Sequence, residues 1–227
     1  TAVQPSDSGY LTIYPQGEIR PVAPSLNFRK GQIVAGLTEV PVSPSGQISI
    51  YNGSAGTTNV IVDIAGYVAT TGASYTPIAP LRICDTRVGN PSGLTGAQTQ
   101  CNGHTLLAKV PLTINVAGLG TIPDTATAVV VNLTAISPKG SGYLTAYPPS
   151  TSPPTASNLN FATSEVVSNE AAVELSGSGT MDLVSNASTD VVVDVAGYFS
   201  ASGSSYTPLS PQRIADTRCS TSPPPSF

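Results

Sequence analysis

Four aspartates are the residues of this chain whose types and spacing most suggest chemistry. Asp63 and Asp194 occupy the same position in two copies of one motif, and Asp85 and Asp216 do so in another. Such carboxylates could bind calcium or transfer protons. Calcium loops, however, draw several oxygens from one short segment, and the pattern D-x-[DN]-x-[DN]-G is absent from the sequence. The sequence therefore favours a structural role for these side chains.

Asp194 lies within the apolar run V-V-V-D-V-A at 191–196, which is typical of a strand covered on both faces. Burying a carboxylate is costly unless it is paired or hydrogen-bonded. We therefore expect Asp194 to bind Arg87 or backbone amides and so to clamp the end of the sheet to the opening segment of its module. Asp63 and Arg218 are the corresponding clamp residues of the other copies.

Tyrosines alternate along two predicted strands. Tyr10 and Tyr14 share one strand face, and Tyr143 and Tyr147 repeat the arrangement. Each pair could form a flat platform on which sugar rings stack. Alternatively, the rings pack beneath a loop or against the next module, and this is the interpretation we favour. Both alternatives predict binding rather than catalysis.

His104 is the only histidine of the chain and lies close to Cys101. A zinc site needs three or four ligands at short spacings, but the sequence has no second histidine and no C-x-x-C motif. It also lacks the G-x-S-x-G motif and the glycine motifs that bind phosphates or dinucleotides. We therefore expect a surface histidine, no metal, no cofactor and no enzymatic activity.

Cys84 and Cys101 bracket a sixteen-residue loop that is rich in Gly, Asn, Ser and Gln. We predict a disulfide between them, which would contribute about 3 kcal/mol if unstrained. The alternative is two unpaired, small apolar residues. Cys219 has no obvious partner within its module, and we expect that partner downstream in a longer chain.

The composition is typical of many short strands joined by turns. The chain has 21 prolines and 21 glycines, a hydrophobic fraction of 40% and a charged fraction of only 10%, which excludes a disordered chain. The net charge of −4, with scattered lysines and arginines, argues against a nucleic-acid partner. No apolar run is long enough to span a membrane.

The segments that hold these residues are repeated. The motif T-D-V-V-V-D-V-A-G-Y-F at 189–199 matches T-N-V-I-V-D-I-A-G-Y-V at 58–68, 131 residues earlier. We predict the rear part of one module at 1–74 (the first copy), a complete module at 75–205 (the complete copy) and the start of a further one at 206–227.

Strand-forming stretches separated by turn residues fill the complete copy, and none of its segments has a sustained helical period. The fold class that we predict is all-β, with antiparallel β-sandwich modules in tandem. The predicted strand segments are 104–115, 127–136, 142–147, 171–175, 180–184 and 190–195, and an irregular connection is expected at 87–103.

The motifs P-x-R-I-x-D-T-R, G-Y-L-T-x-Y-P, L-N-F and V-D-V-A-G-Y occur together and in this order. In this combination the chain resembles a tandem repeat module of actinobacterial-type secreted and cell-surface proteins. The resemblance covers nearly the whole chain and implies an extracellular, β-rich accessory or structural unit. It supplies no catalytic residues.

From these observations we expect a non-enzymatic extracellular or cell-surface module that acts as a spacer, coat or filament subunit. The first copy lacks middle strands, and its open sheet edges could be completed by strand exchange with an identical or neighbouring module. The alternative is a carbohydrate- or cell-wall-binding module that uses the paired tyrosines.

Overall fold

The computed structural model describes residues 1–149 and 152–203, and its regular structure is almost entirely β-strand. Within these ranges the helical structure consists of one 3-10 helix, η1 (Gly96–Cys101), in the predicted irregular connection. No helix of the described part is long and apolar enough to cross a membrane. The predicted fold class, all-β with antiparallel sheets, is confirmed.

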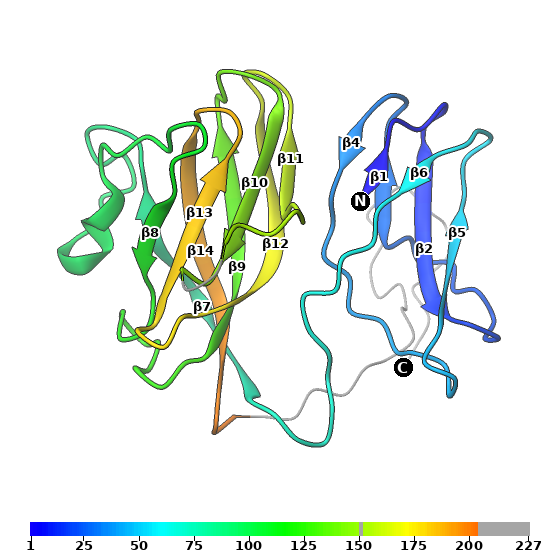
Figure 1. The fold of residues 1–227 in the computed structure, drawn as a ribbon, viewed down its shortest axis with the longest axis horizontal. Coiled ribbons are helices and arrows are strands. Elements are labelled where there is room, and N and C mark those ends of the chain that lie inside the picture. Colours follow the sequence, from blue (N-terminus) through cyan, green and yellow to red (C-terminus); the bar gives the residue numbers. More distant parts are fainter. Residues whose placement is uncertain (150–151, 204–227) are drawn as a thin grey trace, which may run out of the picture. The chain divides into compact units, whose positions relative to one another are not determined.

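The complete copy contains two four-stranded antiparallel sheets, with strand orders β12-β9-β14-β7 and β11-β10-β13-β8 (Figure 1). Because side chains alternate along a strand, one face of each sheet can line a shared apolar core, as in a β-sandwich. The strands are β7 (Ser74–Asp85), β8 (Leu112–Asn115), β9 (Ala128–Ile136), β10 (Gly142–Tyr147), β11 (Leu159–Phe161), β12 (Val166–Glu174), β13 (Thr180–Ser185) and β14 (Asp190–Ser200).

The apolar core of this sandwich receives side chains from both sheets. Burial of each valine or leucine contributes about 1.5–3 kcal/mol. Its fully buried members include Val129, Val131 and Leu133 of β9, Leu144 of β10, Met181 and Leu183 of β13, and Val191, Val193 and Val195 of β14. The cluster runs from Ile83 to Val195, so it lies entirely within the complete copy.

Strand β14 is one of the two inner strands of its sheet, because it forms one ladder with β9 and another with β7. Asp194 lies opposite Asn132 of β9 and opposite Arg82 of β7. The ladder with β7 is irregular between Val193 and Asp194, and it is irregular again before Gly197. A side chain at position 197 would collide with the ring of Tyr75, so glycine is required for this close approach.

Five of the predicted strand segments correspond to β9, β10, β12, β13 and β14. The prediction of a strand over 104–115 is wrong for most of its length, because only Leu112–Asn115 belongs to a strand. Lys109 has a φ of 64°, a left-handed conformation that interrupts an extended strand. Leu106 keeps a single bridge to Thr189.

The first copy forms two three-stranded sheets, with orders β4-β1-β6 and β3-β2-β5. Each of its strand pairs repeats a pair of the complete copy: Leu11 lies opposite Leu26 as Leu144 lies opposite Leu159. The module boundaries 1–74 and 75–205 stay predictions. The strands are β1 (Ala2–Val3), β2 (Gly9–Pro15), β3 (Leu26–Phe28), β4 (Ile33–Val34), β5 (Ile48–Asn52) and β6 (Asn59–Val60).

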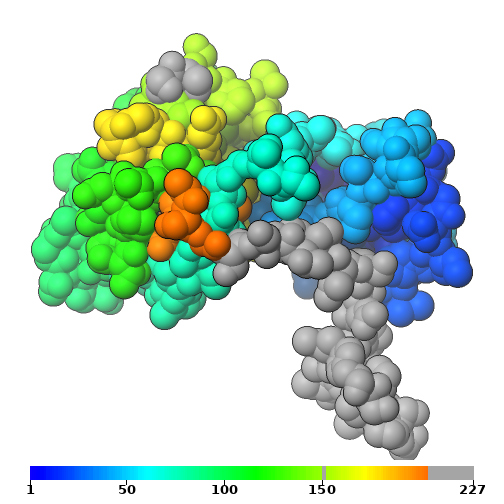
Figure 2. Space-filling view, turned by 90° about the horizontal axis from the view of Figure 1, so that it is seen from below, coloured from blue at the N-terminus to red at the C-terminus, as the bar shows by residue number. Residues whose placement is uncertain are grey.

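The two copies differ after β6. Strand β14 continues to Ser200, whereas its counterpart in the first copy has no regular structure beyond Val60. Residues 61–72 are exposed, and in the space-filling view this part of the chain, coloured cyan to turquoise, lies at the surface (Figure 2). Within the described part, the first copy has no counterpart of β7 or β8.

Candidate functional site

Asp194 of β14 and Arg82 of β7 form an ion pair across the sheet. The Arg82 Nε donates to Oδ1 of Asp194 at 2.8 Å, and its Nη2 donates to Oδ2 at 3.0 Å. This two-point geometry is the strong form of a guanidinium–carboxylate contact. The side chain of Arg82 is 37% exposed and that of Asp194 is 19% exposed, so water weakens the ion pair without abolishing it.

The expectation that Asp194 binds Arg87 is wrong, although Asp194 does hold the opening segment of the module. The register places Arg82 directly opposite Asp194. Arg87 lies beyond the end of β7 and binds Asp85 instead, with Nε–Oδ1 and Nη2–Oδ2 distances of 3.0 and 2.7 Å. Arg82 and Arg87 lie five residues apart in the same segment. The sequence does not show which of them faces Asp194, and only the strand register distinguishes them.

Ser92 connects this second ion pair to the first. Its hydroxyl donates to Oδ2 of Asp85, and Nη1 of Arg82 donates to the same hydroxyl at 2.9 Å. The backbone amide of Arg87 donates to Oδ1 of Asp85 at 3.1 Å. Burial raises the pKa of Asp85, but these hydrogen bonds and the positive charge of Arg87 outweigh it and lower the pKa to about 2.

The contacts of this charged network indicate a structural role and not a catalytic one. The network consists of Arg82, Asp85, Arg87, Ser92 and Asp194. A general base works best with a pKa near the working pH, whereas Asp85 stays ionised throughout the physiological range. Both oxygens of each carboxylate already accept hydrogen bonds from an arginine. Over residues 1–149 and 152–203, no group of three His, Cys, Asp or Glu side chains is placed to hold a metal ion.

The predicted disulfide between Cys84 and Cys101 is present beside this network. Their Cα atoms are 5.3 Å apart, and both residues are buried. The side-chain amide of Gln98 donates to the carbonyl of Arg82 at 2.6 Å, and that of Gln100 donates to the carbonyl of Ile83 at 3.1 Å. The disulfide and these two glutamines therefore tie η1 to β7, and no sequence motif indicated the role of the glutamines.

The tyrosine platform, the less favoured of the two alternatives, is not formed on β10, because the two rings have different surroundings. Tyr143 is 41% exposed, whereas Tyr147 is only 3% exposed. Burial raises the pKa of Tyr147, and the charge of Asp182 and the hydrogen bond to its carboxylate raise it further. Asp182 lies opposite Tyr147 on β13 and also accepts a hydrogen bond from Thr113 at 2.6 Å.

The chain that follows β10 covers this end of the strand. The Thr145 hydroxyl donates to the carbonyl of Ala156 at 2.8 Å, and the amide of Ala146 donates to Oδ1 of Asn158 at 2.7 Å. Sequence periodicity identified the shared strand face but not the carboxylate of Asp182, to which Tyr147 hydrogen-bonds.

In the first copy, Tyr10 and Tyr14 are both partly buried, and the aromatic contact involves a residue that the sequence did not indicate. Tyr10 packs against Tyr51 of β5, with ring centroids 6.4 Å apart and planes tilted by 46°. The guanidinium of Arg20 lies 3.8 Å from the centroid of the Tyr51 ring. Tyr51 lies opposite Thr12, which makes it a diagonal neighbour of Tyr10.

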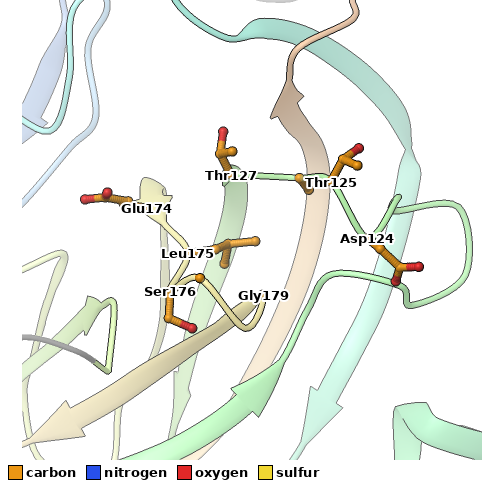
Figure 3. Close-up of a pocket in the computed structure, with 9 residues that line it drawn as sticks. Asp124, Thr125, Thr127, Glu174, Leu175, Ser176 and Gly179 are labelled. Atoms are coloured by element: carbon orange, nitrogen blue, oxygen red, sulfur yellow. The ribbon is translucent and has the colours of Figure 1, made fainter.

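A surface pocket of about 320 Å³ lies at one end of the complete copy. Its carboxylates, Asp124 and Glu174, lie on opposite sides and point away from one another (Figure 3). His104 is exposed and does not line this pocket. Two carboxylates that point away from one another, with no imidazole among the lining residues, do not form an acid–base pair.

Of the remaining clamp residues, Asp63 is exposed and makes no ion pair with any residue that the structure describes. Arg218, like Asp216 and Cys219, lies outside the described residues.

No protein-family profile matches this sequence, no curated protein matches it, and no solved structure matches its fold.

Proposed function

We propose that this chain is a non-enzymatic structural unit of the cell exterior: a spacer, coat or filament subunit that associates with identical or neighbouring modules. The observation that carries the proposal is the exact repetition of strand register in the two copies. A protein that builds a surface from one reused module needs this repetition, whereas a single active site does not.

The charged groups of the complete copy support a structural role. Two ion pairs, a linking serine and a disulfide all involve residues of β7. The Arg82–Asp194 pair binds this edge strand to β14, and the disulfide binds it to η1. The disulfide also supports an extracellular location, because oxidising compartments preserve such bonds.

Open sheet edges in the first copy support self-association. Strand β5 is an edge strand of its sheet, and its Ile50 and Tyr51 are 38% and 40% exposed. In the complete copy, the equivalent strand β13 is covered by β8. An uncovered edge offers unpaired backbone groups to a strand of another molecule.

A glycan-binding role is the second candidate, and the aromatic contact of Tyr10 with Tyr51 favours it. The exposed ring of Tyr51 could contribute to a stacking surface. Arg20 already lies over that ring, however, and would have to move to admit a sugar.

Analytical ultracentrifugation over a wide range of protein concentration tests the structural proposal. We expect assemblies that grow with concentration and are weakened by Ile50→Lys, which places a charge on the open edge. The control is Leu107→Lys, which changes a similarly exposed side chain that is not in a strand.

A pull-down on chitin, cellulose and bacterial cell wall separates the two candidates. Retention that is lost in Tyr51→Ala or Tyr143→Ala, in a protein that stays monomeric at every concentration, would replace the structural proposal with glycan binding.

A further inference from the structure

The 3-10 helix η1 covers two edge strands of the complete copy. Strand β7 is an edge strand of one sheet, and β8 is an edge strand of the other. The helix contacts both strands, and Figure 1 shows it as the coiled ribbon beside β8. An edge strand presents unpaired backbone groups, so a segment that covers such a strand decides what else can pair with it.

Gln100 of η1 takes the place of a further strand beside β8. The backbone amide of Asn115 donates to Oε1 of Gln100 at 2.8 Å, and Nε2 of Gln100 donates to the carbonyl of Asn115 at 2.9 Å. A residue of an adjacent antiparallel strand would make the same two bonds, because a carboxamide has the donor and the acceptor of a peptide group. The same Nε2 donates to the carbonyl of Ile83, so one side chain joins both edges.

The two edges differ in the protection that they have without η1. Strand β7 contains Pro77 and Pro80, which cannot donate a backbone hydrogen bond, and the irregularity of its ladder leaves Ile83 without a partner on β14. Strand β8 reads L-T-I-N and contains neither a charged residue nor a proline. Charges, prolines and bulges are the features that keep edge strands from pairing with other molecules. The edge of β8 therefore depends on its cover.

The attachment of η1 to the sandwich is narrow. Cys101 is the buried residue of the helix, and the N-cap has no side-chain hydrogen bond. A 3-10 helix of six residues is not stable by itself. The disulfide from Cys101 to Cys84 is its covalent anchor on β7, and Gln98 and Gln100 add hydrogen bonds. Without the disulfide, the helix keeps hydrogen bonds that water can replace.

We propose that η1, held by the Cys84–Cys101 disulfide, keeps the edge of β8 covered. Reduction of the disulfide by a dithiol releases η1 and lets β8 pair antiparallel with β8 of a second copy. The inference goes beyond the proposed function, because it assigns to the complete copy an interface that does not involve β5.

The release is a thiol–disulfide exchange. A thiolate of the dithiol attacks one sulfur of the disulfide and forms a mixed disulfide, which the second thiol of the same reductant then resolves. The dithiol gives up two electrons and two protons and becomes a disulfide, while Cys84 and Cys101 become thiols. Because both cysteines are buried, the attack takes place in molecules in which η1 has opened.

A second copy is the partner that β8 itself favours. The amide and carbonyl of Asn115 face away from β13, because they bind Gln100. Alternate residues of an antiparallel strand turn these groups to the same side, so Thr113 presents a second pair. Two identical strands can satisfy one another about a two-fold axis. Neither strand has a charge that would oppose the same charge in its copy.

Sedimentation of the full chain tests the pairing in an Ile50→Lys, Cys219→Ser background, which weakens assembly through β5 and removes the third thiol. We expect monomers in the oxidised protein, and dimers that increase with protein concentration in dithiothreitol. Thr113→Lys should prevent these dimers, because it brings like charges together at the paired edges. The matched control is Thr121→Lys, in an exposed turn outside the strands.

Hydrogen exchange in the same samples locates the change. After reduction, the amides of residues 96–103 should exchange faster, and those of Thr113 and Asn115 should become protected as dimers form. Faster exchange over 96–103 without dimers, or dimers that persist in Thr113→Lys, would overturn the pairing of β8. A disulfide that resists dithiothreitol, unchanged exchange over 96–103 in reduced protein, or loss of protection throughout β9 would overturn the release of η1.

Gln100→Glu tests the cover while the disulfide stays intact. A carboxylate cannot donate to the carbonyls of Ile83 and Asn115, so hydrogen exchange at the Asn115 amide should become about tenfold faster. The control is Gln98→Glu, which removes a bond to β7 alone. Equal effects of the two substitutions would overturn the role of Gln100. None of these measurements depends on glycan retention or on assembly through β5, so the inference and the proposed function can fail separately.

Discussion

The first and complete copies pair their strands in the same register but bury them to different extents. Leu11 and Leu144 are both buried on equivalent strands. Ile50, by contrast, is 38% exposed where its counterpart Leu183 is fully buried. Register is therefore a property of the local motifs, whereas burial depends on how many strands surround them.

The difference between the copies arises at the sheet edges. In the complete copy, β7 and β8 each cover one edge, and the described part of the first copy has no counterpart of either. The apolar core cluster that the structure describes lies within the complete copy. Three experiments test the contributions of core and ion pairs, beginning with the largest expected effect.

Leu183→Ala should lower the free energy of unfolding of the complete copy by about 2–5 kcal/mol, because it leaves a cavity in the core. Ile50→Ala should cost the first copy only about 1 kcal/mol, since Ile50 is already partly exposed. Hydrogen exchange at β13 and at β5 measures the two effects separately. Equal losses would mean that the first copy has a core of its own.

Asp85→Asn should destabilise the complete copy by about 2 kcal/mol at neutral pH. The pKa of Asp85 falls from 3.8 to about 2 on folding, so its stabilisation is complete above pH 4 and is lost as the pH falls towards 2. Urea unfolding of both proteins should therefore show a difference in stability that closes at low pH. A difference that persists at pH 2 would show that packing, and not charge, explains the loss.

Asp194→Asn should cost about 1–2 kcal/mol, because a partly exposed ion pair loses its charge but keeps part of its hydrogen bonding. Glu170→Gln, on the exposed face of β12, is the control and should change stability by less than about 0.5 kcal/mol. Thermal unfolding followed by circular dichroism compares the two. A loss no greater than that of the control would show that the ion pair does not clamp β7 to β14.

Much of the fold could be predicted from local patterns. Runs of β-branched residues between glycine and proline turns predicted five of the strands, and the spacing of Cys84 and Cys101 predicted their disulfide. The strand over 104–115 was mispredicted, because its composition does not reveal that Lys109 adopts a left-handed conformation.

The candidate site was predicted less well, because it depends on contacts between distant segments. Asp194 was expected to bind Arg87 or backbone amides. Arg82 and Arg87 are five residues apart in one segment, and only the ladder between β7 and β14 selects Arg82. Similarly, Tyr143 and Tyr147 share a strand face, but only Tyr147 is buried, where it hydrogen-bonds Asp182 of β13.

The sequence by itself determined the strand class, the repeated motifs and the residues able to pair, because these follow from side-chain alternation and turn chemistry over a few residues. Tertiary structure decided which arginine each aspartate binds, which tyrosine is buried and which copy has a core. Those outcomes depend on register and on coverage by segments distant in the chain. The motifs at 58–68 and 189–199, which agree at seven of eleven positions, therefore differ in exposure.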